Sequence, residues 1–172
     1  MLQGQTISLE ISDLADSGDG VGRYQDFVVF VPNTVPGDRI EAKLIHVKAN
    51  LAYATLAQIT EPSSDRIRPS CIVADKCGGC QWQAVSYDRQ LAAKQNHAIQ
   101  ALHRIGGFTL EEIGAVLSPI MGAEAVLGYR NKATYPLAND SGRVKAGYYQ
   151  KGSHKIVNLN QCPVQDNRLD PL

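Results

Sequence analysis

The chain has 172 residues, of which 44% are hydrophobic and 20% charged, a composition typical of a globular protein with one or two domains. Its formal net charge is zero, yet residues 1–70 carry 6 Lys or Arg against 9 Asp or Glu, and residues 71–172 carry 11 against 8. No apolar run reaches the roughly 18 residues of a membrane-spanning helix, and the N-terminus lacks the pattern of a secretory signal. We therefore expect a cytoplasmic protein without membrane contact, whose cysteines are not organised as disulfides.

Residues 6–60 predict a small all-β unit. Apolar and polar residues alternate over 7–11 and again over 40–44, as half-buried strands require. The run FVVFV at 27–31 and the segment 51–59 predict further strands, and turn signals separate them. About five short strands in this length favour a small closed or partly open barrel.

A glycine-rich stretch, Gly18-Asp19-Gly20-Val21-Gly22, lies inside this unit. It matches the G-x-G-x-G pattern of nucleotide-binding loops, which requires a strand before the loop and a helix after it. Here a strand-like segment, 23–31, follows at once. The stretch therefore predicts a β-turn.

Beyond a Pro- and Ser-rich linker at 60–70, the pattern predicts one long helix. Ser86 can cap it, and Gly106-Gly107 can end it after about residue 105. Five apolar residues share one stripe of this helix: Tyr87, Leu91, Ala98, Leu102 and Ile105. Four basic residues lie on its other faces, where we expect a solvated surface: Arg89, Lys94, His97 and Arg104.

After Gly128 the hydrophobic period returns to two, beginning at 133–137, and turn signals at 138–142 and 151–153 predict an antiparallel meander. Arg and Lys neutralise phosphates and Tyr can stack on unpaired bases, and both kinds are concentrated in this region. The candidate RNA contacts are Arg130, Lys132, Arg143, Lys145, Tyr149 and Lys151. A lysine-decorated sheet with tyrosines in its core is an equally good interpretation of the pattern.

The four cysteines of the chain are Cys71, Cys77, Cys80 and Cys162. Three thiols in one loop and a distant fourth would tie the loop to a remote element through a metal centre, and four thiolates suit either zinc or an iron–sulfur cluster. Gly78-Gly79 would let the backbone fold closely around a bulky group and direct N–H groups at its sulfurs. Four unrelated buried cysteines would leave this clustering unexplained.

Taken together, four segments make the chain resemble the N-terminal half of the RNA (uracil-5-)-methyltransferases, in particular the 23S ribosomal RNA type. Residues 20–44 resemble a TRAM domain, an OB-like RNA-binding barrel. CIVADKCGGCQWQ (71–83) resembles the cluster loop of this family, residues 87–108 its following helix, and YRNKATYPL (129–137) with QCPVQ (161–165) its central domain.

This resemblance implies an α+β protein with a five-stranded OB-like barrel at 1–62, followed at 63–172 by a cluster-binding loop, a helix and an antiparallel β meander. It implies a [4Fe–4S] cluster on Cys71, Cys77, Cys80 and Cys162, with zinc as the alternative, and RNA, chiefly ribosomal RNA and not DNA, as the partner. In the family, S-adenosylmethionine and the nucleophilic cysteine belong to a C-terminal catalytic domain, which we expect to be missing here. The expected role is therefore RNA binding without catalysis. The rival interpretations are a stand-alone zinc-stabilised RNA-binding module, a tRNA-directed methyltransferase fragment and a redox iron–sulfur protein that binds no RNA.

Overall fold

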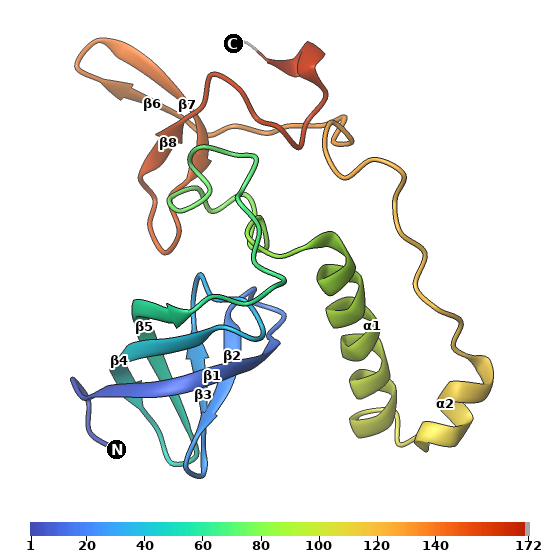
Figure 1. Cartoon of the computed structure of the whole chain (residues 1–172). Coiled ribbons are helices and arrows are strands. Elements are labelled where there is room, and N and C mark those ends of the chain that lie inside the picture. Colours follow the sequence, from blue (N-terminus) through green and yellow to red (C-terminus); the bar gives the residue numbers. More distant parts are fainter. Residues whose placement is uncertain (171–172) are drawn as a thin grey trace. The chain divides into compact units, whose positions relative to one another are not determined.

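The computed structural model describes residues 1–170, which form two compact units that are each discontinuous in sequence. The first unit comprises Met1–Ile67 and Ala84–Gly122, and the second comprises Arg68–Gln83 and the residues after Gly122 (Figure 1). The long helix therefore groups with the barrel. The continuous domain ranges 1–62 and 63–172 stay a prediction.

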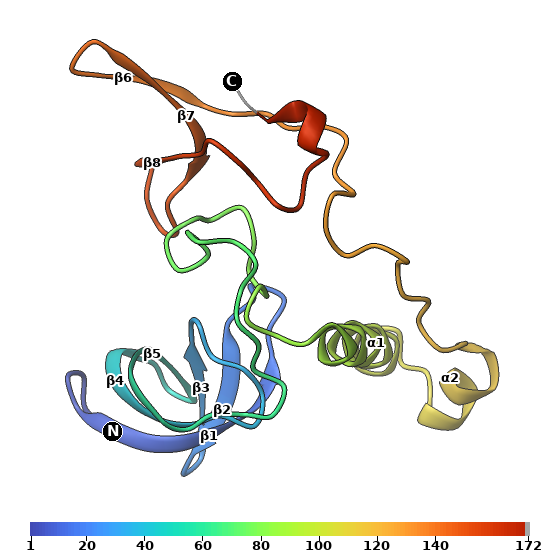
Figure 2. The ribbon, with the colours of Figure 1, turned by 45° about the horizontal axis from the view of Figure 1, so that its top comes forward.

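The first unit contains a closed barrel of five strands in the order β1-β2-β3-β5-β4, closed by antiparallel pairing of β1 with β4 (Figure 2). The strands are β1 (Thr6–Leu14), β2 (Gly20–Tyr24), β3 (Phe27–Val31), β4 (Arg39–Val47) and β5 (Leu51–Glu61). Strands β3 and β5 pair in parallel, and the other neighbours pair antiparallel. Alternate residues point inward, so the barrel core consists of Ile7, Leu9, Ile11, Val29, Val31, Ile40, Ala42, Leu44, Ala52 and Ala54. The predicted barrel is confirmed.

The glycine-rich stretch differs from its prediction. Only its first part is a turn, at residues 16–18, whereas Gly20 and Gly22 lie within strand β2. A Cβ on Gly22 would stand 2.5 Å from the carbonyl oxygen of Glu10, so this glycine allows β2 to approach β1 closely. The segment 23–31, predicted as continuous strand, is instead a hairpin of β2 and β3 that turns at Gln25, whose φ is 54°.

Helix α1 (Tyr87–Arg104) begins as predicted, because the Ser86 hydroxyl accepts a hydrogen bond from the Arg89 amide. Its expected apolar stripe is not a buried face, since Ala98 and Ile105 are exposed and Ala93 is the buried residue of the helix. Polar contacts join the helix to the end of β1 instead. Asn96 Nδ2 lies 3.2 Å from Asp13 Oδ2, and His97 Nε2 lies 2.6 Å from the Leu14 carbonyl oxygen.

The prediction that the basic residues of α1 form a solvated surface is therefore only partly correct. Arg89 Nη2 donates to the Ser12 carbonyl oxygen at 3.3 Å, and His97 Nδ1 lies 2.9 Å from Asp16. A second helix, α2 (Leu110–Val116), was not predicted from the sequence. It begins at a capping box in which Thr109 and Glu112 bond each other's backbone amides, and the T-x-x-E pattern was its available sequence signal.

The second unit contains the predicted meander, a sheet of β6 (Leu137–Asp140), β7 (Arg143–Tyr149) and β8 (Ile156–Asn158) in that order, all antiparallel. It starts later than the period-two pattern suggested, because residues 131–136 have no regular structure. A short 3-10 turn, η1 (Asn167–Leu169), lies near the end of the described chain. Among residues 1–170, no helix is long and apolar enough to cross a membrane.

Candidate metal centre

Two segments of the second unit bring the cysteines together. The loop that carries Cys71, Cys77 and Cys80 folds back on itself through turns, with the Cys77 amide donating to the Val73 carbonyl oxygen at 2.8 Å. Cys162 follows β8, and its amide lies 3.2 Å from Asp170 Oδ1. Both segments are thus held by local hydrogen bonds that do not involve the thiols.

The rest of the unit fixes the two segments in place. The cysteine loop pairs with the end of β7, where the Gly78 amide donates to the Tyr149 carbonyl oxygen at 2.8 Å. The segment after Cys162 pairs with residues 128–130, and the Arg130 amide donates to the Val164 carbonyl oxygen at 2.9 Å. The positions of the thiols are therefore set by backbone pairing.

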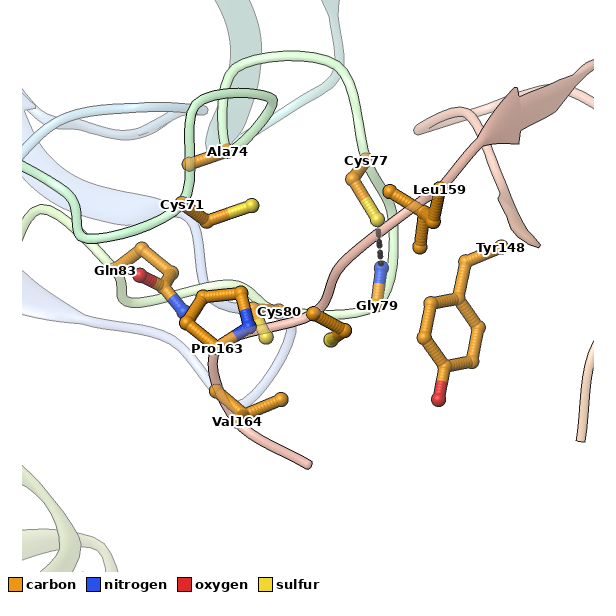
Figure 3. A pocket seen from close by; sticks show the side chains of 11 residues that line it. Cys71, Ala74, Cys77, Gly79, Cys80, Gln83, Tyr148, Leu159, Pro163 and Val164 are labelled. Carbon is orange, nitrogen blue, oxygen red and sulfur yellow. Dashed lines mark hydrogen bonds between the residues drawn. The ribbon is translucent and has the colours of Figure 1, made fainter. Parts of the chain in front are cut away.

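All four cysteines line one hollow, shown in Figure 3, with an empty volume of about 330 Å³ that includes its open side. Cys77 and Cys162 are buried, and Cys71 and Cys80 are half-buried. The remaining lining is largely apolar and consists of Ala74, Gly79, Gln83, Tyr148, Leu159, Pro163 and Val164. A hollow walled by four thiols and hydrocarbon offers sulfur as its principal ligand atom.

Burial raises the pKa of the Cys77 thiol above its usual value, and the neighbouring Cys71, Cys80 and Cys162 add to this rise. Burial likewise raises the pKa of Cys162, to which Cys80 and Cys71 contribute. Both pKa values rise because several negatively charged thiolates close together are unfavourable in a site with little water. The thiols are thus close enough to interact electrostatically.

Gly78 and Gly79 allow the cysteine loop to pack closely on strand β7, in addition to their expected role near the sulfurs. A Cβ on Gly78 would lie 2.8 Å from the Tyr149 carbonyl oxygen, and one on Gly79 would lie 2.9 Å from the Tyr148 ring. Close packing of the loop on the sheet therefore requires both glycines. The Gly79 amide also donates to Cys77 Sγ at 3.4 Å, the kind of N–H to sulfur contact expected from the sequence.

In the described residues, no group of three or more His, Cys, Asp or Glu side chains converges closely enough to hold a metal ion. The four thiols surround the hollow and do not meet at one point. The donor set and the apolar lining are compatible with a sulfur-ligated group, and its binding by the four cysteines stays a prediction.

The candidate RNA contacts fall into two sets. Arg143, Lys145 and Tyr149 alternate along β7 and so share one face of the sheet, on which Lys145 Nζ lies 2.5 Å from Asp140 Oδ2. Lys132 is exposed in the irregular segment before β6, and Lys151 is half-buried after β7. Arg130 is directed elsewhere: its Nη1 donates to the Tyr148 hydroxyl at 3.2 Å, beside the cysteine hollow.

The two tyrosines of β7 lie on opposite faces of the sheet, because successive side chains of a strand point to opposite sides. Tyr148 faces the cysteine hollow and packs edge-on against Tyr135, with ring centroids 5.0 Å apart. Tyr149 lies on the opposite face and is 44% exposed. One tyrosine thus packs inside the unit and the other is exposed, and RNA contact by this sheet stays a prediction.

The first comparison with known proteins concerns the barrel. Residues 2–57 match the family model of the TRAM domain, in agreement with the closed five-stranded barrel. The barrel is therefore a TRAM domain, and the resemblance is confirmed for this part of the chain.

The relatives extend the similarity to the whole chain. It is 60% identical over 171 residues to an uncharacterized RNA methyltransferase of a Nostoc species and 57% identical over 171 residues to one of a Synechocystis species. These matches cover 99% of this chain but 36% of each relative, so the chain spans about a third of their length.

A solved structure agrees in fold. The Pyrococcus abyssi tRNA (uracil-54, C5)-methyltransferase, in complex with S-adenosyl-L-homocysteine, is 25% identical and matches with a TM-score of 0.55. The match covers 93% of this chain and 33% of that one. The TRAM domain and these relatives point to RNA binding.

Proposed function

We propose that this chain is the RNA-binding, [4Fe–4S]-bearing portion of an S-adenosylmethionine-dependent RNA (uracil-5-)-methyltransferase. The observation that carries the proposal is that all four cysteines of the chain, from two segments far apart in sequence, line one apolar hollow. The relatives named RNA methyltransferase support the RNA part of the proposal.

The resemblance of the cysteine loop to the family's cluster loop is what favours a cluster over zinc. Four thiolates on one zinc ion at about 2.3 Å would have their sulfurs about 3.8 Å apart. A cluster interposes iron and sulfide between the thiolates and so needs them farther apart. All four thiols line one hollow, an arrangement that is compatible with the larger group. Bound there, the cluster would cross-link the 71–80 loop to Cys162 and stabilise the sheet beside them.

Methyl transfer itself would require residues that this chain does not offer. The reaction inferred from the resemblance needs a cysteine that attacks C6 of uracil and so makes C5 nucleophilic. In our proposal all four thiols of this chain are cluster ligands, so none serves as that nucleophile. We therefore assign catalysis and S-adenosylmethionine binding to the part of the longer relatives that this chain does not match.

Two RNA classes are candidates for the substrate. Ribosomal RNA follows from the sequence resemblance, whereas transfer RNA is favoured by the similarity to a solved tRNA (uracil-54, C5)-methyltransferase. Competition between a tRNA transcript and 23S ribosomal RNA fragments for binding to the chain distinguishes them. Tighter binding of tRNA, by tenfold or more, would exclude the ribosomal assignment.

Metal analysis tests the cluster. Protein purified without oxygen should contain about four irons and four acid-labile sulfides per chain. Cys162→Ser should lose most of this iron, whereas Ser70→Ala, a matched change beside the first ligand, should keep it. About one zinc per chain and no sulfide would exclude the cluster and favour a zinc-stabilised RNA-binding module.

Charge reversal tests the candidate RNA contacts, one in the irregular segment before β6 and one on β7. Lys132→Glu and Lys145→Glu should each weaken RNA binding and reduce its dependence on salt, since phosphate contacts release counterions. Lys94→Glu makes the same charge change on helix α1 and should leave both properties unchanged. RNA affinity that is equal in all three variants and the parent chain would contradict the assignment of this surface.

A further inference from the structure

The outer surface of the barrel carries a row of three aromatic rings that the functional argument has not used. Tyr53 on β5 is paired in register with Phe30 on β3 on one side and with His46 on β4 on the other. The Phe30 and Tyr53 rings are stacked with centroids 5.4 Å apart, and the Tyr53 and His46 rings with centroids 6.4 Å apart. We call Phe30, Tyr53 and His46 the aromatic row.

The aromatic row is not part of the barrel core. The residues that alternate with Phe30 and Tyr53, such as Val29 and Ala52, point inward and are fully buried. Tyr53 is 37% exposed, and His46 is exposed. Burial in the core therefore does not account for three rings on adjacent strands, which lie at the outside of the barrel and stack on one another.

Basic side chains lie beside the row. Lys48 Nζ lies 5.8 Å from the centroid of the Tyr53 ring, in a cation–π position. Lys43 is exposed beside Thr55, the next outward residue of β5 after Tyr53, and Arg23 is exposed on β2. An aromatic surface flanked by cations is the arrangement by which proteins hold single-stranded nucleic acid, with bases on the rings and phosphates on the cations.

A cavity within the first unit adjoins the aromatic row, because Phe30 belongs to the row and also lines the cavity. It lies between the barrel and helix α1, has an empty volume of about 740 Å³ including its open side, and is lined by Val21 and Phe30 together with Asn96, Gln100 and Arg104. Amide and guanidinium side chains can hydrogen-bond the edges of unpaired bases. Asn96 donates to Asp13 and accepts from Gln100, and His97 lies against Asp16, so Arg104 is the side chain of this cavity that the proposal uses.

We propose that the aromatic row stacks unpaired bases of single-stranded RNA on the outer face of the barrel. This inference rests on the proposed RNA-binding function, but it uses residues and strands separate from the basic face of β7. Barrels of the OB type bind oligonucleotides over their second and third strands. Phe30 lies on β3, and Tyr53 and His46 extend the row onto β5 and β4. The row would stack on the flat face of any unpaired base and would not select a particular RNA sequence.

Binding measurements with the whole chain test the proposal. The probes are a single-stranded uridine oligomer of about 12 nucleotides, within the site size of one such barrel, and an abasic oligomer with the same number of phosphates. Tyr53→Leu should weaken binding of the uridine oligomer by about 5- to 150-fold, the range of base–aromatic stacking. Tyr53→Phe keeps the ring and should bind like the parent chain, and neither change should affect the abasic oligomer.

The outcomes separate this site from the RNA function in general. If Tyr53→Leu binds the uridine oligomer like the parent chain while Lys145→Glu weakens it, RNA binding stands and the aromatic row is excluded. If Tyr53→Leu weakens both oligomers equally, the row does not read bases and the proposal fails. If the parent chain binds neither oligomer but binds a tRNA transcript or 23S ribosomal RNA fragments, this inference fails and the RNA function stands. If it binds none of these RNAs, both are overturned.

A measurement on the unsubstituted chain guards against loss of folding in the variant. Bases stacked on the row should shift the ring protons of His46 and Tyr53 upfield in the NMR spectrum when the uridine oligomer is added. The abasic oligomer should not produce this shift. Unchanged ring resonances at a saturating concentration of bound uridine oligomer would refute the stacking site.

Discussion

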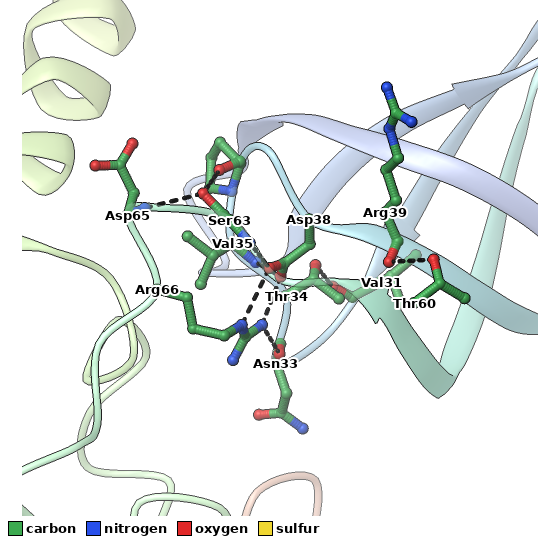
Figure 4. Close-up of polar contacts among 11 residues, drawn as sticks. Val31, Asn33, Thr34, Val35, Asp38, Arg39, Thr60, Ser63, Asp65 and Arg66 are labelled. Atoms are coloured by element: carbon green, nitrogen blue, oxygen red, sulfur yellow. Dashed lines mark hydrogen bonds and ion pairs between the residues drawn. The ribbon is translucent and has the colours of Figure 1, made fainter.

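The loop between β3 and β4 is held by a buried carboxylate, and its replacement gives the most quantitative prediction. Asp38 is fully buried, and each of its oxygens accepts two hydrogen bonds (Figure 4). Oδ2 accepts from the Val35 amide at 2.7 Å and from Arg66 Nη2 at 2.5 Å. Oδ1 accepts from the Ser63 amide at 2.9 Å and from Arg66 Nε at 3.1 Å. Asp38 thus ties the barrel to the segment that leaves it.

Asp38→Asn keeps the shape but replaces one oxygen with an NH₂ group that would face two donors. Breaking a buried ion pair in this way costs about 3–5 kcal/mol, mostly because groups are left unpaired. The Arg66 side chain is 21% exposed and also donates to the Asn33 carbonyl oxygen, so water and this contact offset part of the loss. We expect a loss of about 3 kcal/mol, or a Tm lower by about 6–12 °C for a protein of this size.

The same contacts give the effect a defined pH dependence. Burial alone would raise the pKa of Asp38, but hydrogen bonds from Arg66, Ser63 and Val35 outweigh it and the net pKa is lowered. A carboxyl group whose pKa is lower in the folded state stabilises that state fully above its unfolded pKa of about 3.9. This contribution disappears as the pH falls through the folded pKa. The stability difference between parent and Asp38→Asn should therefore be constant from pH 5 to 7 and shrink below about pH 4.

Thermal unfolding followed by circular dichroism, at several pH values, measures both effects. Asp26→Asn, in the exposed turn between β2 and β3, is the matched control and should change stability by less than about 0.5 kcal/mol. A Tm for Asp38→Asn within 1 °C of the parent at pH 7 would refute the reasoning. So would a stability difference that is the same at pH 3 and pH 7.

Three further predictions concern packing, capping and the metal centre. Gly22→Ala should lower the free energy of unfolding, measured by denaturant titration, by about 2 kcal/mol, because its Cβ would press on the Glu10 carbonyl oxygen. Gly114→Ala lies in open space on α2. In the same titration it should be neutral or stabilising by up to about 1 kcal/mol. Thr109→Ala removes the cap of α2 and should cost about 1 kcal/mol, seen as faster amide exchange in Leu110–Val116 and not in α1. Removing the proposed cluster with a chelator should speed amide exchange in β7 and leave the barrel strands unaffected. Equal effects on both would contradict a local structural role.

The sequence pattern was sufficient for the local elements. Alternation over 7–11 and 40–44 predicted strands because one face of each is buried in the barrel, and Ser86 predicted the start of α1 because a hydroxyl there satisfies a free amide. It failed where a contact between distant segments decided the conformation. Gly20 and Gly22 resembled a turn, but the closeness of β1 and of Thr34 explains them. The apolar stripe of α1 was misleading because the helix meets the barrel through Asn96 and His97.

For the candidate site, the clustering of Cys71, Cys77 and Cys80, with Cys162 as a distant fourth, predicted a common centre, and the barrel and meander followed from hydrophobic period and turn signals. Only the tertiary structure decided which residues meet. It brought Cys162 to the loop, because residues after it pair with 128–130, and it turned Arg130 toward Tyr148. It also placed Phe30, Tyr53 and His46 side by side from three strands. Spacing and period report on neighbours along the chain, whereas a site is made by register between strands, which depends on how the whole sheet closes.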